Sequence, residues 1–362
     1  MKRILPIILL IALLLNGCSS LKSSPTTSPQ TPAGTTAPVG TTAPVGITAP
    51  AGTMVPAGTA AVASLVPLGT PSAKYGGIAR SLIVDMTNIG PRVAGSEGET
   101  NTAQYIVSAF KAIGYNPVTQ PFTAPSGNQT ISSANISAVK TGNSSQEIIV
   151  GAHYDSTNAG PGADDNASGV AVMLEVAKLV LGASTPYTIH FVAFGAAESG
   201  LAGSYAYLNQ MSQSEIQDVI AMIDLDSLVA GDVAYAYSDE GQATVRDWAL
   251  EWALGNGFNL QTIHNAGLKY PDNNGIGSSD YVPFQAAGIP YVYFNTTDWS
   301  LGDNKGTTQV DPKFGNNGVI RNTKYDTLAY LDASFPGRVD QNLNLFISVL
   351  YNVLTQYEAP AS

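Results

Sequence analysis

The residue types best suited to chemistry in this chain gather at the ends of successive apolar segments. His153 and Asp155 directly follow one such segment, and Glu198 follows another. Imidazole nitrogen combined with carboxylate oxygen is a donor set that suits zinc. The recurrence of these residue types at several segment ends indicates a metal site. The full set of candidates is His153, Asp155, Asp164, Asp165, Glu198, Asp224 and Asp226.

Each candidate also has a structural interpretation. Asp164 and Asp165 precede a predicted helix, where Asp is a favourable N-cap residue. Asp224 and Asp226 alternate along a strand, so only one of them can face a given side. A single histidine at a strand end is more often structural than a metal ligand. The metal-site interpretation therefore depends on the whole group of residues.

The elements that position these residues alternate between helix and strand. Helical spacing or helix-start signals predict helices over residues 97–113, 168–181, a short segment from 201, 243–254 and about 20 residues from 335. Apolar runs predict strands over residues 131–139, 147–152, 187–194, 219–225 and 289–294. Near-continuous apolar strands are typical of a mostly parallel sheet that helices cover on both faces. We expect one α/β domain over residues 74–362, with its site at the carboxyl ends of the strands.

Four motifs occur in order along this domain. They read GAHYDS from Gly151, PGADDNASG from Pro161, FGAAESGLAGS from Phe194 and DLDS from Asp224. This pattern resembles the aminopeptidase-type metallopeptidase family 28, whose members bind two zinc ions. The resemblance starts at residues 90–96 and continues to Asp326 and Thr327. It implies a zinc-aminopeptidase-like α/β/α sandwich that acts on the N-terminus of a peptide or protein.

The resemblance also implies roles for individual residues. His153 and Asp226 match ligands of the first zinc ion, and Asp165 matches the carboxylate that bridges both ions. Glu198 matches a ligand of the second ion. Asp155 matches the carboxylate that orients the zinc-binding histidine, a role with a clear physical basis.

Two positions depart from the family pattern. Members of the family carry a Glu-Glu pair where this chain has Ala197-Glu198, and the downstream glycines show that the missing residue is the first of the pair, the general base. Members also carry a histidine where this chain has Asn322, so the second zinc ion loses a ligand. An alanine methyl group cannot accept a proton, and general-base catalysis is commonly worth about 10²- to 10⁴-fold in rate. We therefore expect one zinc ion rather than two, and impaired hydrolysis.

Two other histidines are available as replacements. His190 lies inside a predicted strand, where a structural role is expected, and the sequence leaves the role of His264 open. Three functions remain: an active aminopeptidase with a substitute base, a pseudo-peptidase that binds a peptide or protein without turnover, and a different reaction on the same scaffold, as in glutaminyl cyclases. The two departures favour the impaired or inactive forms.

The N-terminal region indicates where the protein acts. Residues 1–18 have a basic start, a short apolar stretch and then Cys18, which resembles a bacterial lipoprotein signal whose cysteine receives the lipid. Residues 19–73 are rich in Thr, Pro, Ala and Gly and are expected to form an extended tether. The sequence favours an extracytoplasmic domain held to a bacterial membrane by a lipid anchor alone, and the alternative is an ordinary secretory signal with an incidental cysteine. A net charge of -11 and the lack of basic runs after Arg3 make nucleic acid an unsuitable partner.

Overall fold

The computed structural model describes residues 74–238, 244–262, 278–302 and 306–359. Contacts divide the chain into residues 1–63 and 64–362, and only the second unit contains described residues. Its helices are α1 (Gly77–Asn88), α2 (Glu97–Ile113), η1 (Ala163–Ser168), α3 (Gly169–Val180), η2 (Ala197–Ser199), α4 (Ala202–Gln210), α5 (Gln213–Asp218), α6 (Thr244–Gly255), α7 (Tyr281–Ala286), α8 (Leu328–Ser334) and α9 (Arg338–Gln356). Its strands are β1 (Val118–Ser126), β2 (Gln129–Lys140), β3 (Ser144–His153), β4 (Tyr187–Phe194), β5 (Val219–Leu225), β6 (Val233–Tyr237), β7 (Leu260–Gln261) and β8 (Tyr291–Thr297).

These strands form one sheet in the order β1-β2-β4-β3-β5-β8-β6-β7. The central strands β4, β3, β5 and β8 run parallel to one another. Antiparallel pairings flank this centre, between β2 and β4 and between β1 and β2 on one side, and between β6 and β8 on the other. The predicted α/β fold with a parallel centre is therefore confirmed. The whole sheet is mixed, because antiparallel pairs flank that centre.

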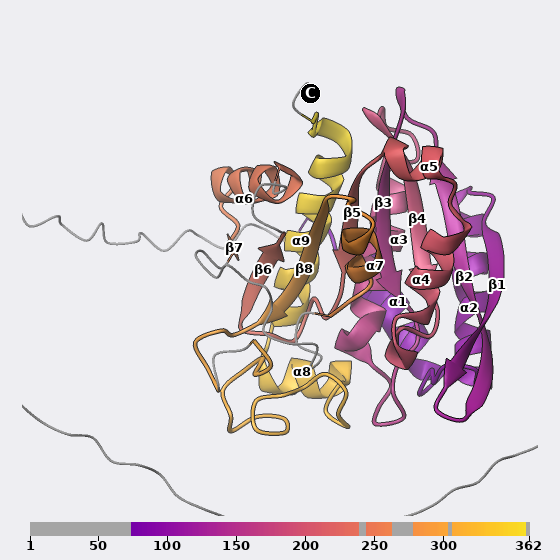
Figure 1. The fold of residues 1–362 in the computed structure, drawn as a ribbon. Coiled ribbons are helices and arrows are strands. Elements are labelled where there is room, and N and C mark those ends of the chain that lie inside the picture. The colour runs from indigo at the N-terminus through magenta and orange to yellow at the C-terminus, as the bar shows by residue number, and fades with distance from the viewer. Residues whose placement is uncertain (1–73, 239–243, 263–277, 303–305, 360–362) are drawn as a thin grey trace, which may run out of the picture. The chain divides into compact units, whose positions relative to one another are not determined.

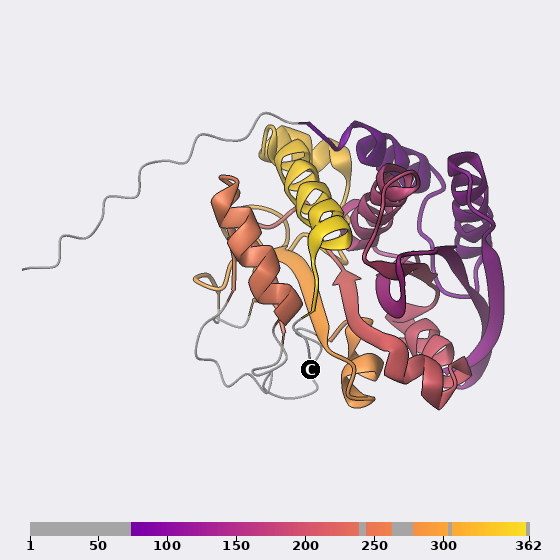
Figure 2. The same cartoon turned by 90° about the horizontal axis from the view of Figure 1, so that it is seen from above.

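Helices cover both faces of the sheet (Figures 1 and 2). The helices α1, α2, α3, α6 and α9 form one layer, in which α3 packs against α1 and α9. The helices α4, α5 and α7 lie on the other face. The central strands are consequently buried from both sides, and their near-continuous apolar sequence follows from this position.

The predicted helix over residues 97–113 illustrates how local sequence determines an element. The Ser96 side chain accepts a hydrogen bond from the Glu99 amide at the start of α2, and Gly114 ends the helix with φ 120°. Ile106 and Phe110 from the predicted apolar face are fully buried. Both ends of this helix agree with the prediction.

Other boundaries and elements differ from the sequence prediction. The last helix begins at Arg338 and not at Phe335, because the short helix α8 ends at Ser334 and Gly337 lies between them in a left-handed conformation. The strand β1 was not predicted because it contains Pro121 and Pro125, which cannot donate to a neighbouring strand. Its place at the edge of the sheet is the one where proline is tolerated.

Several predictions concern residues outside the described ranges. The lipid attachment at Cys18, the signal segment 1–18 and the tether 19–73 all lie there, and so does His264. Across the described ranges, the helices fall short of the length and apolar character that a membrane crossing requires.

Candidate metal centre

Three predicted ligands converge at the carboxyl ends of two neighbouring strands. His153 is the last residue of β3, Asp226 follows β5 directly, and Asp165 lies in η1, which leads into α3. His153 Nε2 lies 3.2 Å from Asp165 Oδ1 and 3.8 Å from Asp226 Oδ1. One donor atom from each residue lies within 4.8 Å of the other two, and all three residues are buried.

This geometry fits a zinc ion. Two ligands of a tetrahedral zinc at about 2.1 Å lie roughly 3.4 Å apart, close to both distances measured from His153 Nε2. Burial alone would lower the pKa of His153, but Asp155, Asp165 and Asp226 together raise it well above its ordinary value. Burial favours a higher pKa for Asp226, but His153 outweighs this and holds the pKa of Asp226 at about 2. The concentration of negative charge around the imidazole is the environment in which a cation is stabilised.

Asp155 lies behind His153 and connects it to the next loop. Its Oδ1 lies 3.4 Å from His153 Nδ1 and its backbone oxygen lies 3.2 Å from the same nitrogen. Acceptors at Nδ1 keep the proton there and leave the Nε2 lone pair available to a metal. The same carboxylate accepts hydrogen bonds from the amides of Ala197 at 2.9 Å and Glu198 at 3.0 Å. One buried carboxylate therefore positions both the histidine and the segment that carries Glu198.

The adjacent residues Asp164 and Asp165 serve different purposes. Asp164 points away from the metal ligands and accepts hydrogen bonds from the Val229 amide at 2.7 Å and the Gln309 side chain at 2.7 Å. The Asp326 carboxylate accepts hydrogen bonds from the amides of Asp164 at 2.6 Å and Asp165 at 3.1 Å. These contacts hold the start of η1, so that only Asp165 faces the metal ligands.

The second metal position has a different chemical character. The side-chain amide nitrogen of Asn322 donates to Asp165 Oδ2 at 3.0 Å. Burial and the charge of Asp165 raise the pKa of Glu198 to about 8, while His153 and Asn322 oppose this rise. Asn322 therefore presents an N–H donor to Asp165. A metal ion at this position would take the side-chain oxygen of Asn322, which is a poorer zinc ligand than imidazole.

A cavity of about 140 Å³ opens on the metal ligands. Ala197 lines this cavity beside Glu198, and its side chain offers no proton acceptor. Most of the other described lining residues are polar, and Leu201 is the only other apolar one among them. The described residues that line the cavity are His153, Asp165, Ala197, Glu198, Leu201, Asp226, Ser278, Ser279, Tyr293, Arg321 and Asn322.

Two other candidates lie apart from this cavity. His190 in β4 pairs with Glu147 at 3.3 Å and contacts Tyr207 at 3.3 Å, a structural arrangement as expected. Asp224 is fully buried behind the site, where it accepts a hydrogen bond from the Tyr281 amide at 2.9 Å. Neither residue lines the cavity.

Several residues that contact the ligands were not predicted from the sequence. The hydroxyl groups of Ser227 and Ser279 donate to Asp226 at 2.8 and 2.9 Å, and the Tyr293 hydroxyl lies 3.5 Å from the same carboxylate. Arg321 lines the cavity next to Asn322. Serine, tyrosine and arginine are too common for a single sequence to distinguish these positions, although Arg321 and Asn322 are adjacent in the chain.

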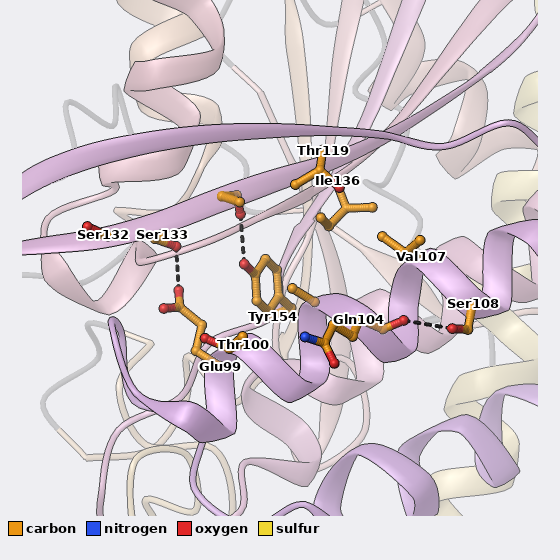
Figure 3. A pocket seen from close by; sticks show the side chains of 12 residues that line it. Glu99, Thr100, Gln104, Val107, Ser108, Thr119, Ser132, Ser133, Ile136 and Tyr154 are labelled. Atoms are coloured by element: carbon orange, nitrogen blue, oxygen red, sulfur yellow. Dashed lines mark hydrogen bonds between the residues drawn. The ribbon is translucent and has the colours of Figure 1, made fainter.

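Glu99 supports the site from a distance. This buried carboxylate accepts hydrogen bonds from the Ala196 amide at 3.0 Å, from Ser133 at 2.6 Å and from the Gly95 amide at 2.5 Å. It borders a separate pocket of about 550 Å³ between α2 and the β1–β2 hairpin, which Figure 3 shows together with Tyr154. Burial raises the pKa of Glu99, while Ser133 and the two amides oppose this rise. Glu99 therefore fixes the residue that immediately precedes Ala197.

The sequence of this chain is similar to one family model and to several known proteins. The family model described as peptidase family M28 matches residues 135–347. The chain is 29% identical over 311 residues to the alkaline phosphatase isozyme conversion protein of Escherichia coli K12, covering 77% of this chain and 90% of that protein. It is 30% identical over 218 residues to aminopeptidase YwaD of Bacillus subtilis, covering 59% of this chain but only 42% of that relative.

The fold is also similar to that of solved structures. A zinc aminopeptidase from Bacillus subtilis superposes with a TM-score of 0.62 and 20% identity, covering 78% of this chain and 96% of that structure. This likeness confirms the zinc-aminopeptidase-like α/β/α sandwich.

Proposed function

The chain belongs to peptidase family M28. On this premise we propose that it binds peptide N-termini at a single zinc ion and hydrolyses the N-terminal peptide bond weakly or not at all. The relatives named aminopeptidases support the substrate class. The buried triad of His153, Asp165 and Asp226 supports the metal. When bound, zinc supplies a Lewis acid that polarises a carbonyl oxygen.

The observation that carries the proposal is Ala197. Its methyl group lines the cavity, and by the motif resemblance this position corresponds to the family's general base. The amide of Ala197 is held by the Asp155 carboxylate at 2.9 Å, so the segment has a defined conformation and no acceptor side chain at this position. The loss of a general base commonly lowers the reaction rate by about 10²- to 10⁴-fold. Peptide binding needs no such base and is retained in this proposal.

Metal content tests the first part of the proposal. We expect one zinc ion per chain by elemental analysis after dialysis, because Asn322 offers N–H donors at the second position. Asp226→Asn should abolish zinc retention, while Asp311→Asn, an exposed position paired with Lys313, is a matched control that should retain it. A wild-type content of two zinc ions would contradict the assignment of a single site.

Turnover tests the second part. The zinc-loaded chain is expected to show little chelator-sensitive hydrolysis across a panel of aminoacyl-nitroanilides. Ala197→Glu combined with Asn322→His should restore part of the activity, because the two changes return the base and the missing ligand. If wild type turns over at a rate that Ala197→Glu does not improve, impairment at this position is refuted.

One observation favours a second candidate, an active enzyme with a single metal ion. Among the described residues that line the cavity, Glu198 is the one carboxylate outside the first triad, so it is available to accept a proton in place of the missing base. Glu198→Gln would then abolish any wild-type hydrolysis while zinc content stays at one per chain. Unchanged hydrolysis in Glu198→Gln would exclude this candidate.

We further propose that Cys18 carries a lipid that anchors the protein outside the cytoplasm. The support is the basic, apolar and cysteine sequence of residues 1–18 together with the tether-like composition of residues 19–73. Metabolic labelling with a radioactive fatty acid should mark the wild-type chain and not Cys18→Ser. Equal labelling of both would refute the anchor.

A further inference from the structure

Arg321 is the one arginine or lysine among the described residues that line the metal-site cavity. Its backbone is held firmly, because the amides of Ile320 and Arg321 donate to Gln309 Oε1 at 3.0 and 2.8 Å. Gln309 is itself fully buried and donates to Asp164 at 2.7 Å. The hydrogen bonds that hold η1 therefore also hold the backbone of Arg321 at the cavity wall.

The guanidinium group has unused hydrogen-bonding capacity. Among the described residues it donates one side-chain hydrogen bond, from Nη2 to Gly306 O at 3.2 Å, and it forms no ion pair within 4.0 Å. A guanidinium has five N–H donors, and leaving such donors unpaired in a partly buried position is unfavourable. Burial by itself lowers the pKa of Arg321, but Tyr293 and nearby carboxylates such as Asp226 raise it, so the side chain is charged.

The charge balance of the cavity changes when the triad holds a divalent cation. The cation would offset the charges of Asp165 and Asp226. Arg321 lines the same cavity as a positive charge near Tyr293 and Asp226, and it has N–H donors that no described residue accepts. A planar fork of N–H groups matches the two oxygens of a carboxylate better than any neutral group.

We propose that Arg321 is a specificity-determining residue that binds a carboxylate of the ligand held at the metal centre. This inference rests on the proposed function, because it assumes that a peptide occupies the cavity. A volume of about 140 Å³ corresponds to a few water molecules, so the proposal places the carboxylate close to the peptide amino end. Two sources meet this requirement: an acidic side chain on the first residue, or the terminal carboxylate of a dipeptide.

Calorimetric titration of the full, zinc-loaded chain distinguishes these sources without requiring turnover. The three probes are Asp-Ala-amide, which carries an acidic first residue, Leu-Ala, which carries a free terminal carboxylate, and Leu-Ala-amide, which carries neither. Wild type should bind at least one carboxylate probe about tenfold more tightly than Leu-Ala-amide, and the preferred probe identifies the source.

Substitutions then attribute this preference to Arg321. Arg321→Gln should reduce the preference to less than twofold and leave both Leu-Ala-amide affinity and zinc content unchanged. Arg321→Lys should retain part of the preference, because it keeps the charge and loses the fork. Arg246→Gln on α6, which removes one charge outside the cavity lining, is the matched control and should behave like wild type.

Two results would overturn the assignment. One is a wild-type chain that binds neither carboxylate probe more tightly than Leu-Ala-amide. The other is an Arg321→Gln chain that keeps the wild-type preference. Zinc content measured on the same samples reports separately on the metal site, so a failure of the proposed function is recognised by missing zinc and not by the probe preference.

Discussion

Replacing Asp155 with asparagine tests how one buried carboxylate organises the site. Asp155 is fully buried and accepts hydrogen bonds from the amides of Ala197 and Glu198 at 2.9 and 3.0 Å. It also faces His153 Nδ1 at 3.4 Å. Asparagine has nearly the same shape but only one acceptor oxygen, so one of these N–H groups would face an NH₂ group.

The expected magnitude follows from these contacts. A hydrogen bond to a charged group contributes about 1.5–3 kcal/mol, and a buried N–H left without a partner costs about 1–3 kcal/mol. The replacement should therefore lower the free energy of unfolding by roughly 3 kcal/mol, since one bond is lost and the other becomes neutral. Because His153 loses its charged partner, zinc affinity should fall by about 10- to 100-fold.

Two assays separate these effects. Urea unfolding in the presence of chelator measures the stability change without any contribution from the metal, and competition with a zinc-binding dye measures affinity on the folded chain. Asp311→Asn, at an exposed carboxylate that pairs with Lys313, is the control for loss of charge. A stability change below about 1 kcal/mol would refute the hydrogen-bond argument, and unchanged zinc affinity would refute the orienting role.

Three further outcomes follow from the structure. Zinc at one hundred times its dissociation constant should stabilise the fold by about 2.7 kcal/mol. Differential scanning calorimetry with and without chelator should then show a rise of roughly 5–10 °C in the unfolding temperature, and no rise would argue against zinc binding. His190→Ala should lower the free energy of unfolding in urea by at most about 1 kcal/mol and leave zinc affinity unchanged, because its partner Glu147 is partly exposed and remote from the cavity. A large loss of zinc affinity would contradict the structural role of His190. Gly203→Ala should lower the free energy of unfolding by about 1–3 kcal/mol, because the added Cβ would lie 2.3 Å from the backbone oxygen of Gly195. Wild-type stability in urea unfolding would contradict this packing.

The fold class and the metal triad were accessible from the sequence because both depend on local patterns. Buried parallel strands have continuous apolar sequences, so β3, β4 and β5 were recognisable, and their carboxyl ends meet at one edge of the sheet. Residues that follow those strands, such as His153 and Asp226, were therefore expected near one another. The expected departures at Ala197 and Asn322 rest on the longer motif in which each residue lies.

Other features depended on contacts between distant segments. Asp164 and Asp165 have the same side chain at adjacent positions, and only the partners Val229 and Gln309 distinguish the structural carboxylate of Asp164 from the one that faces the other metal ligands. Glu99 lies almost one hundred residues before Ala196, yet its carboxylate holds the Ala196 amide. No local pattern encodes such a pairing.

The sequence by itself predicted the alternation of helices and strands, the residues at the ends of β3, β4 and β5, and an alanine where the family motif has a glutamate. Only the tertiary structure decided that Asn322 turns its N–H group toward Asp165 and that Arg321 lines the cavity with donors that no described residue accepts. The physical reason is that strand periodicity and strand-end position are properties of neighbouring residues. The direction of a side chain from an irregular segment, in contrast, depends on the charges and acceptors that other parts of the chain bring to it.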